Sequence, residues 1–111
     1  MIELTVYDFL KNTKKLNVFM VVPATRPDAF YVIEKTGSSL TNHVSKATFA
    51  IRSYAKTQYD AALMNEVVKS AMFDLITLDE VSKVSLNSDY NYTDTDTKTY
   101  SYQAVFVVTH Y

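Results

Sequence analysis

The fold is decided by the C-terminal segment 84–111, which reads VSLNSDYNYTDTDTKTYSYQAVFVVTHY. Both halves of this segment are rich in β-branched and aromatic residues, and the polar run 94–97 separates them. Two such runs joined by a short polar turn are typical of a β-hairpin. The segment therefore predicts one strand over 84–93, a second strand over 98–111 and a turn between them.

The expected register of this hairpin follows from its apolar residues. If Thr93 pairs with Lys98, then Leu86 lies opposite Val105 and apolar residues face one another at the base of the hairpin. A shift by one residue would turn these side chains to the other face of the sheet. We therefore expect Leu86 opposite Val105 unless a β-bulge changes the pairing.

Four of the nine tyrosines lie near the expected tip of the hairpin: Tyr90, Tyr92, Tyr100 and Tyr102. A strand of about ten residues is about 33 Å long, whereas the radius of gyration of a 100-residue domain is about 13 Å, so we expect the tip to project. Tyrosine offers a large contact area and is enriched in interfaces. The four rings are therefore candidate subunit-interface residues. The alternative is that they cap the core or form cross-strand pairs on a solvated ribbon.

The second strand of the hairpin is apolar on both faces near its end. Ala104, Phe106 and Val108 alternate with Val105 and Val107 along the chain. Because only two helices are expected, one face of the sheet stays partly uncovered, and a partner would cover it. The alternative is a central strand that helix and loop bury on both sides.

Upstream of the hairpin, hydrophobic spacing predicts two helices and three strands. In chain order we expect a helix over 2–15, a buried strand over 18–22, a strand over 30–36 with a turn at 37–39, a strand over 43–55 and a helix over 57–75. Thr57 is the expected N-cap of the second helix. The apolar residues of that helix are expected on one stripe: Leu63, Met64, Val67, Val68, Ala71 and Leu75. The order α-β-β-β-α-β-β predicts a single α+β domain over 1–111, with two helices packed on a mainly antiparallel sheet.

Composition excludes several classes of function. The 111 residues carry a net charge of −1 and no cysteine, which excludes disulfides, thiolate nucleophiles and cysteine zinc sites. This charge balance argues against nucleic-acid binding, which needs a basic face. Gly37 is the only glycine, too few for a Walker loop, a dinucleotide fingerprint or a nucleophile elbow. No apolar run approaches the roughly 20 residues that span a bilayer, and no export signal is visible.

The chain offers few groups arranged for catalysis or metal binding. His43 and His110 are its only histidines, and no H-x-x-x-H or H-E-x-x-H pattern connects them to a metal. Asp94 and Asp96 imitate the start of a calcium loop, but threonine and valine stand where glycine and glutamate are required. We therefore expect no catalytic, cofactor or metal site, and no enzyme.

Several short segments of the sequence, and the order in which they occur, are similar to those of a known group of proteins. They are YVIEKTG (31–37), the alternating segment 47–54, YDAA (59–62), LNSDYNY (86–92), Asp94 and Asp96 at the turn, YQ (102–103) and the terminal HY (110–111). In these strings the chain resembles the tail terminator, or tail completion, proteins of bacteriophages with long non-contractile tails. The resemblance covers most of the chain beyond residue 30, and the first helix matches in type and place only.

The resemblance implies a small α+β domain and a structural role. Proteins of this family form a ring, typically hexameric, on the head-proximal end of the tail tube, where it stops tube polymerisation and joins the filled head. The implied partners are further copies of the chain, the tail tube protein and a head-completion or connector protein, with no cofactor, membrane or sequence-specific nucleic acid. The implied location is the virion tail, after assembly in the host cytoplasm.

Other functions stay open from the residues alone. The chain could be another neck component, such as a head-completion or minor capsid protein, or a regulatory partner such as a toxin or antitoxin. It could also be a small α+β ligand-binding domain or enzyme, which would need a pocket with titratable groups. A ring needs contacts between two unlike patches, and we expect the tip of the C-terminal hairpin to provide one of them.

Overall fold

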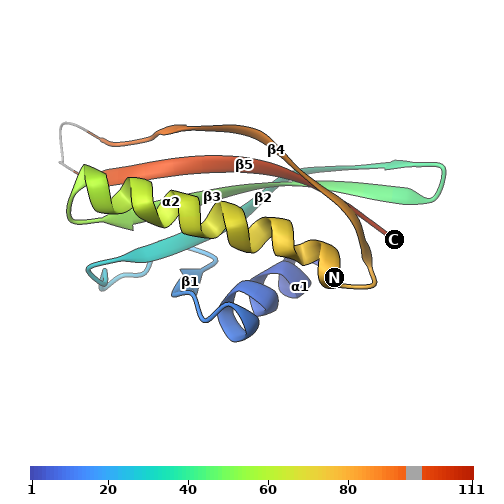
Figure 1. Ribbon diagram of the computed structural model, residues 1–111, viewed down its shortest axis with the longest axis horizontal. Coiled ribbons are helices and arrows are strands. Elements are labelled where there is room, and N and C mark those ends of the chain that lie inside the picture. Colours follow the sequence, from blue (N-terminus) through green and yellow to red (C-terminus); the bar gives the residue numbers. More distant parts are fainter. Residues whose placement is uncertain (95–98) are drawn as a thin grey trace.

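The computed structural model describes residues 1–94 and 99–111 and has an α+β fold (Figure 1). Its helices and strands are α1 (Ile2–Asp8), β1 (Val18–Phe19), β2 (Phe30–Thr41), β3 (Val44–Ala55), α2 (Gln58–Phe73), β4 (Val81–Asn91) and β5 (Tyr100–His110). A π-helical turn over Phe9–Thr13 follows α1, and a 3-10 turn over Asp74–Thr77 follows α2. The expected order α-β-β-β-α-β-β and the α+β class are confirmed.

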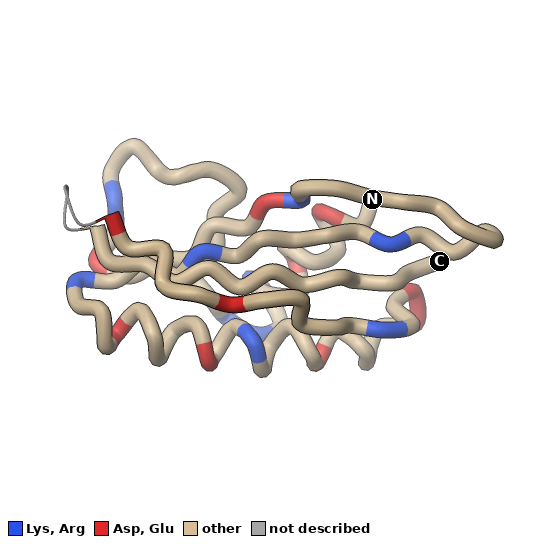
Figure 2. Tube along the Cα trace, turned by 90° about the horizontal axis from the view of Figure 1, so that it is seen from above, with Lys and Arg blue, Asp and Glu red and all other residues tan. Residues whose placement is uncertain are grey.

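The strands form one sheet in the order β1-β2-β3-β5-β4. The pairing of β1 with β2 is parallel, and the other three pairings between these strands are antiparallel, as expected. Both helices lie on one face of the sheet, and α2 packs across β3 and β5 (Figure 1). We call the other face the open face, and Figure 2 looks onto it. Its β5 residues are Ser101, Gln103, Val105, Val107 and Thr109.

The main core lies between the helices and the sheet. Its largest buried side chains include Phe49, Phe106, Leu10, Ile51, Met72 and Leu75. Phe49 of β3 is the direct partner of Phe106 of β5, so both rings point toward the helices from neighbouring strands. Full burial of one such side chain contributes about 1.5–3 kcal/mol. The helix-facing layer is therefore the main source of stability.

The start of α2 is where the sequence predicts it. Thr57 is the N-cap, and its side-chain oxygen accepts a hydrogen bond from the backbone N–H of Asp60 at 3.1 Å. This contact satisfies one of the backbone donors that the first turn of a helix leaves free. The capped start fixes where α2 begins to cross the sheet.

β2 is longer than the sequence predicts. The turn expected at Gly37 does not form, and the strand continues to Thr41 with a register shift between Lys35 and Gly37. A β-bulge of this kind takes up an extra residue without ending the pairing. The chain turns instead at Asn42 and His43, whose φ values are 52° and 66°, as two-residue hairpin turns require. The resulting β2–β3 hairpin reaches beyond both helices at one end of the molecule (Figure 1).

The C-terminal hairpin forms with a register that differs from the prediction. Leu86 lies opposite Phe106, and not opposite Val105. The prediction is wrong because β4 has two register shifts against β5, one within 81–83 and one within 86–88. Each bulge inserts an unpaired residue and moves all later pairs, and alternation of apolar residues alone does not reveal it.

The tip of the C-terminal hairpin lies partly outside the described residues, and so does the expected pairing of Thr93 with Lys98. Asp94 pairs with Thr99 in an isolated antiparallel bridge. The described part of this hairpin runs alongside α2 (Figure 1). In a molecule with extents of 45 × 24 × 23 Å, the hairpin seen to project is β2–β3.

The N-terminal elements are shorter than the sequence predicts. α1 and its π-helical turn end at Thr13, and Lys15 has a φ of 59°, which no helix can contain. β1 comprises Val18 and Phe19 only, where a buried strand over 18–22 is expected. The expectation of a buried strand over 18–22 is wrong, because the pairing with β2 stops at Phe19 and Val21 is 73% exposed. The apolar run in the sequence is therefore longer than the paired strand.

Candidate functional site

The four candidate interface tyrosines lie on two faces of the sheet. Alternation puts Tyr90 and Tyr92 on the open face and Tyr100 and Tyr102 on the face that carries α2. Tyr90 and Tyr92 are 44% and 47% exposed, and their ring centroids are 6.3 Å apart. Tyr100 and Tyr102 are half-buried. The structure therefore brings Tyr90 and Tyr92 together as an exposed aromatic pair and separates them from the other two.

Arg52 of β3 orders the polar part of the open face. Its guanidinium carbon lies 6.0 Å from the ring centre of Tyr54 and 5.9 Å from that of Tyr92. Its Nη2 lies 3.7 Å from Oε2 of Glu34. Cation–π contacts at partly exposed sites contribute about 0.5–1 kcal/mol each. Arg52 therefore connects β2, β3 and the end of β4, and it holds the Tyr92 ring against the sheet.

β5 is a central strand whose two faces differ. On the helix-facing side three of its residues are fully buried: Ala104, Phe106 and Val108. Val105 and Val107 on the open face are only half-buried. Among the described residues no helix covers this face, and the segment after β1 covers only the end that holds Phe30. β5 is thus central, as one alternative expects, but only one of its faces is fully covered.

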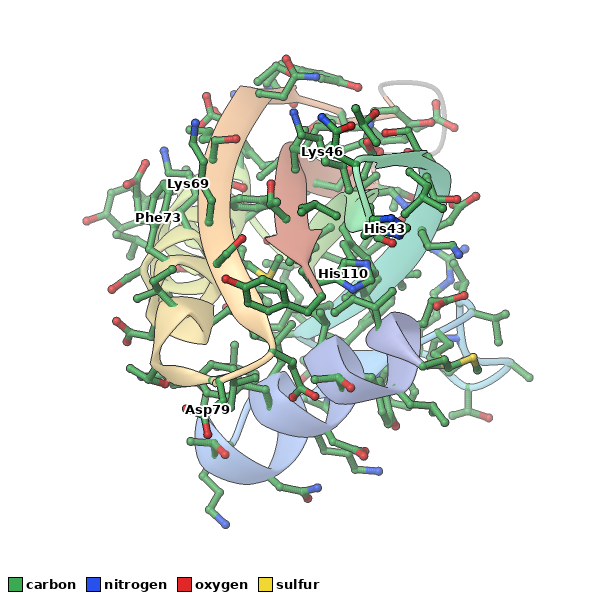
Figure 3. All side chains as sticks on the ribbon, turned by 90° about the vertical axis from the view of Figure 1, so that its right-hand side faces the viewer. His43, Lys46, Lys69, Phe73, Asp79 and His110 are labelled. Atoms are coloured by element: carbon green, nitrogen blue, oxygen red, sulfur yellow. The ribbon has the colours of Figure 1, made fainter. Side chains whose placement is uncertain are left out.

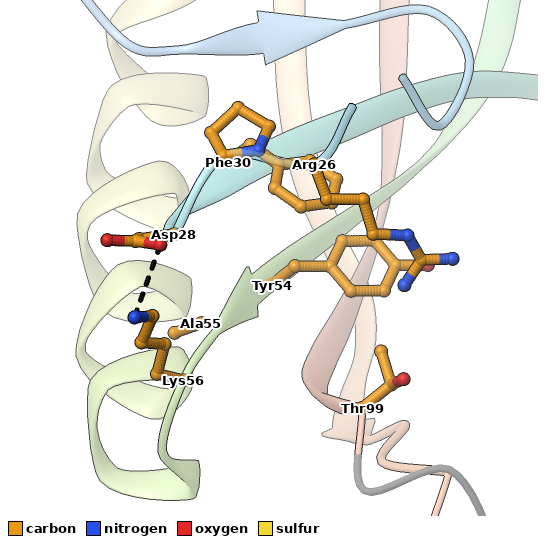
Figure 4. Close-up of a pocket in the computed structure, with 8 residues that line it drawn as sticks. Arg26, Asp28, Phe30, Tyr54, Ala55, Lys56 and Thr99 are labelled. Carbon is orange, nitrogen blue, oxygen red and sulfur yellow. Dashed lines mark ion pairs between the residues drawn. The ribbon is translucent and has the colours of Figure 1, made fainter. Parts of the chain in front are cut away.

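A cavity of about 460 Å³ lies at the end of the open face, and Figure 4 shows its lining. Arg26, Tyr54 and Lys56 are among the residues that line it. Lys56 forms an ion pair with Asp28 at 3.3 Å, whereas Arg26 has no ion-pair partner in the described part of the chain. A second cavity, of about 390 Å³, shares Arg26 and Tyr54 and reaches Tyr92. A guanidinium group on the wall of a cavity favours binding of a carboxylate group. Among the described residues that line the two cavities, none forms a pair of nucleophile and general base.

A network of polar side chains joins α2 to β4. Lys69 Nζ lies 2.6 Å from Asp89 Oδ2 and 2.8 Å from Glu66 Oε1. Asn65, which is buried, donates from Nδ2 to the same Asp89 oxygen at 3.2 Å. The hydrogen bond from Lys69 lowers the pKa of the Asp89 carboxyl, and the bonds to Asp89 and Glu66 raise the pKa of Lys69. The network fixes the helix on the sheet.

The two histidines lie at the same end of the molecule (Figure 3). His43 is in the β2–β3 turn and is exposed, and His110 is the last residue of β5. His110 Nδ1 lies 3.1 Å from the backbone oxygen of Tyr111. Within residues 1–94 and 99–111, no group of three or more His, Asp or Glu side chains could hold a metal ion. Asp96 lies outside the described residues.

α2 has an apolar outer face that the sequence prediction assigns to the core. The expected single stripe is wrong, because Leu63 and Val67 are 48% and 50% exposed while Val68 is fully buried. Residues that are adjacent in sequence lie about 100° apart around a helix, so the apolar pairs 63/64 and 67/68 cannot share one narrow stripe. That angular spread is the signal in the sequence that indicates a second apolar face.

No protein-family model matches this chain, and no curated protein matches it. In the part of the chain that the structure describes, no helix is long and apolar enough to cross a membrane. The surfaces described above and the resemblance of the local strings therefore support the function proposed for this chain.

Proposed function

We propose that this chain is a tail terminator subunit of a long-tailed phage. In this proposal it forms a ring, hexameric as the resemblance implies, on the head-proximal end of the tail tube, where the ring stops polymerisation and offers a surface to the filled head. Its partners are further copies of itself, the tail tube protein and a head-completion protein. The fold of two helices on a mainly antiparallel sheet agrees with what the resemblance implies.

The open face of the sheet is the observation that carries this proposal. The helices bury one side of the sheet, and the other side presents the half-buried Val105 and Val107 beside the exposed rings of Tyr90 and Tyr92. Exposed aromatic residues beside an ordered arginine, here Arg52, are typical of protein interfaces. A closed ring needs two unlike contact patches on every subunit. A sheet that helices cover on one face only leaves its other face available for such a contact.

Light scattering over a concentration series, with negative-stain images of large species, tests ring formation. Incubation with purified tail tubes that lack a terminator then tests capping, and we expect binding at one end of the tube and an end to its growth. Binding to emptied heads but not to tubes would instead favour another neck component. A monomer that binds neither tubes nor heads would contradict the proposal and favour a ligand-binding domain or enzyme.

A further inference from the structure

The outer face of α2 is apolar over about two turns. Tyr59, Leu63 and Val67 follow one another at intervals of four residues and are 72%, 48% and 50% exposed. The opposite side of the same helix is in the core, where Val68 is fully buried. Apolar residues on two opposite sides are typical of a helix that is covered on both sides. We call Tyr59, Leu63 and Val67 the outer face of α2.

The open face of the sheet has the apolar character that such a helix needs in a partner. Tyr90 is exposed on it, and Val105 and Val107 are half-buried. On the opposite side of β5, Phe106 is fully buried beneath the helices. A helix and a sheet face bury one another in this way inside a single domain, so a helix from a second copy fits the uncovered side.

Two lysines lie at one end of the open face. Lys46 of β3 and Lys83 of β4 both lie opposite Thr109 of β5, one on each side of it, so they share its face of the sheet. Both are exposed, and neither forms an ion pair within residues 1–94 and 99–111. Glu34 also lies on this face, where it pairs with Arg52. The two lysines therefore make this end of the open face positive.

The side of the molecule that carries α2 is acidic at the same end. The 3-10 turn and the connector that follow α2 have three charged residues, all acidic: Asp74, Asp79 and Glu80. Asp74 pairs with Lys14, whereas Asp79 and Glu80 are exposed and have no ion-pair partner in the described part of the chain. Figure 3 looks at this end and shows Lys46 on the upper side and Asp79 on the lower side.

The apolar and charged parts of the two surfaces follow the same order along the molecule. α2 runs along the sheet from the end of β3 toward the start of β4 (Figure 1), so Leu63 comes before Asp79 in that direction. On the open face Tyr90 comes before Lys83 in the same direction, because β4 ends beside the end of β3. Two copies in the same orientation therefore place apolar residues on apolar residues and carboxylates near lysines.

We propose that the outer face of α2 in one copy packs on the open face of the next copy. Because the two surfaces are unlike and lie on opposite sides of the molecule, the contact repeats in the same sense from copy to copy. Such a contact generates a ring or an open chain and not a two-fold dimer. The inference rests on the proposed function and deepens it, because it names the surface that the open face binds. Tyr90 and Tyr92 lie inside this contact.

Cysteine cross-linking tests the contact directly, because the chain has no cysteine. We would mix the single variants Leu63→Cys and Ser88→Cys under mild oxidation and measure the disulfide-linked product. Ser88 is exposed and lies on the open face opposite Val105. The contact raises the effective concentration of the two thiols, so the mixed product should exceed that of the control pair Leu63→Cys with Asn12→Cys by about tenfold or more. Asn12 is exposed in the π-helical turn, on the side that carries the helices.

Reversal of charge gives a second test of the same contact. The variant Lys46→Glu with Lys83→Glu makes both surfaces acidic at this end, and the variant Asp79→Lys with Glu80→Lys makes both basic. Each variant alone should stay monomeric at low salt, because like charges then face one another across the contact. An equal mixture of the two should recover the average mass of the wild type by light scattering, since every contact between unlike variants joins opposite charges.

The outcomes separate this inference from the proposed function. A mixed disulfide above the control, with recovery in the mixture of charge variants, supports the contact. A product in which Leu63→Cys or Ser88→Cys is linked mainly to itself would overturn the inference in favour of a two-fold contact. Thiols that react with a small alkylating reagent but give no mixed product would also overturn it, and wild-type rings in that case would leave the proposed function standing. Cross-linked assemblies that do not bind tail tubes would overturn the proposed function and leave the contact between copies.

Discussion

Asp89 of β4 lies 2.6 Å from Lys69 of α2, and this ion pair fixes the helix on the edge of the sheet. Both side chains are partly shielded, with 34% and 18% of their surface exposed. The same carboxylate accepts a hydrogen bond from the buried Asn65. Since the outer face of α2 carries the exposed Leu63 and Val67, the pair also fixes the position of these two side chains.

Asp89→Asn should lower the free energy of unfolding by about 1 kcal/mol at neutral pH, because exposed ion pairs contribute little more than this. The pKa of Asp89 is lowered in the folded protein, so its contribution is complete above the ordinary value of 3.8 and is lost as the pH falls through the folded pKa. Urea unfolding at several pH values measures the difference. A variant as stable as the wild type at neutral pH would show that the pair has no stabilising role.

Tyr31→Phe should reduce the loss of stability at alkaline pH. Burial raises the pKa of Tyr31 from 10.0 to about 12, and its hydroxyl donates to the Met64 carbonyl at 3.0 Å. The folded state holds this proton more tightly than the unfolded state, so stability falls as the pH rises from 10.0 toward about 12. The variant should lose about 1 kcal/mol near neutrality and show a shallower alkaline decline. Tyr59→Phe, at an exposed position, is the control, and an equal change there would contradict the assignment to Tyr31.

Gly37→Ala should stabilise the protein by about 0.4–1 kcal/mol, because alanine restricts the unfolded chain more than glycine does. Gly37 does not have a positive φ, and a Cβ at this position would have no atom within 4 Å. Asn42→Ala is the matched contrast and should destabilise, since its φ of 52° is unfavourable for alanine. Chemical denaturation measures both changes. Destabilisation by Gly37→Ala would mean that the neighbouring bulge requires glycine.

The sequence predicts the parts of this fold that depend on local chemistry. The N-cap at Thr57, the order of elements and the long C-terminal hairpin follow from capping preference, apolar spacing and a polar turn. What fails depends on pairing between distant residues. The bulges that move Leu86 opposite Phe106 leave no composition signal, because their residues are chemically ordinary. The bulge in β2 lies beside Gly37, and an isolated glycine in a strand indicates a bulge as well as a turn, so the residue type alone does not decide between the two.

The candidate interface is predicted less completely than the fold. The sequence places four tyrosines near one tip, but only strand register decides which face each ring occupies, and it groups Tyr90 with Tyr92. The exposure of Leu63 could not be predicted from its apolar character alone. An apolar residue in a helix can serve the core of its own chain or the surface of a neighbour, and the geometry of the whole domain decides between the two.

Tyr90→Ser with Tyr92→Ser should leave the monomer folded and abolish ring formation. Both rings lie on the open face and are half exposed, so their loss removes contact area without opening a cavity in the core. Circular dichroism and thermal unfolding should stay close to the wild type, while light scattering should show monomers at the concentrations where the proposed function has the wild type form rings. Tyr100→Ser, on the helix-facing side, is the control and should mainly reduce stability. Normal rings from the Tyr90/Tyr92 double variant would remove the open face from the assembly contact.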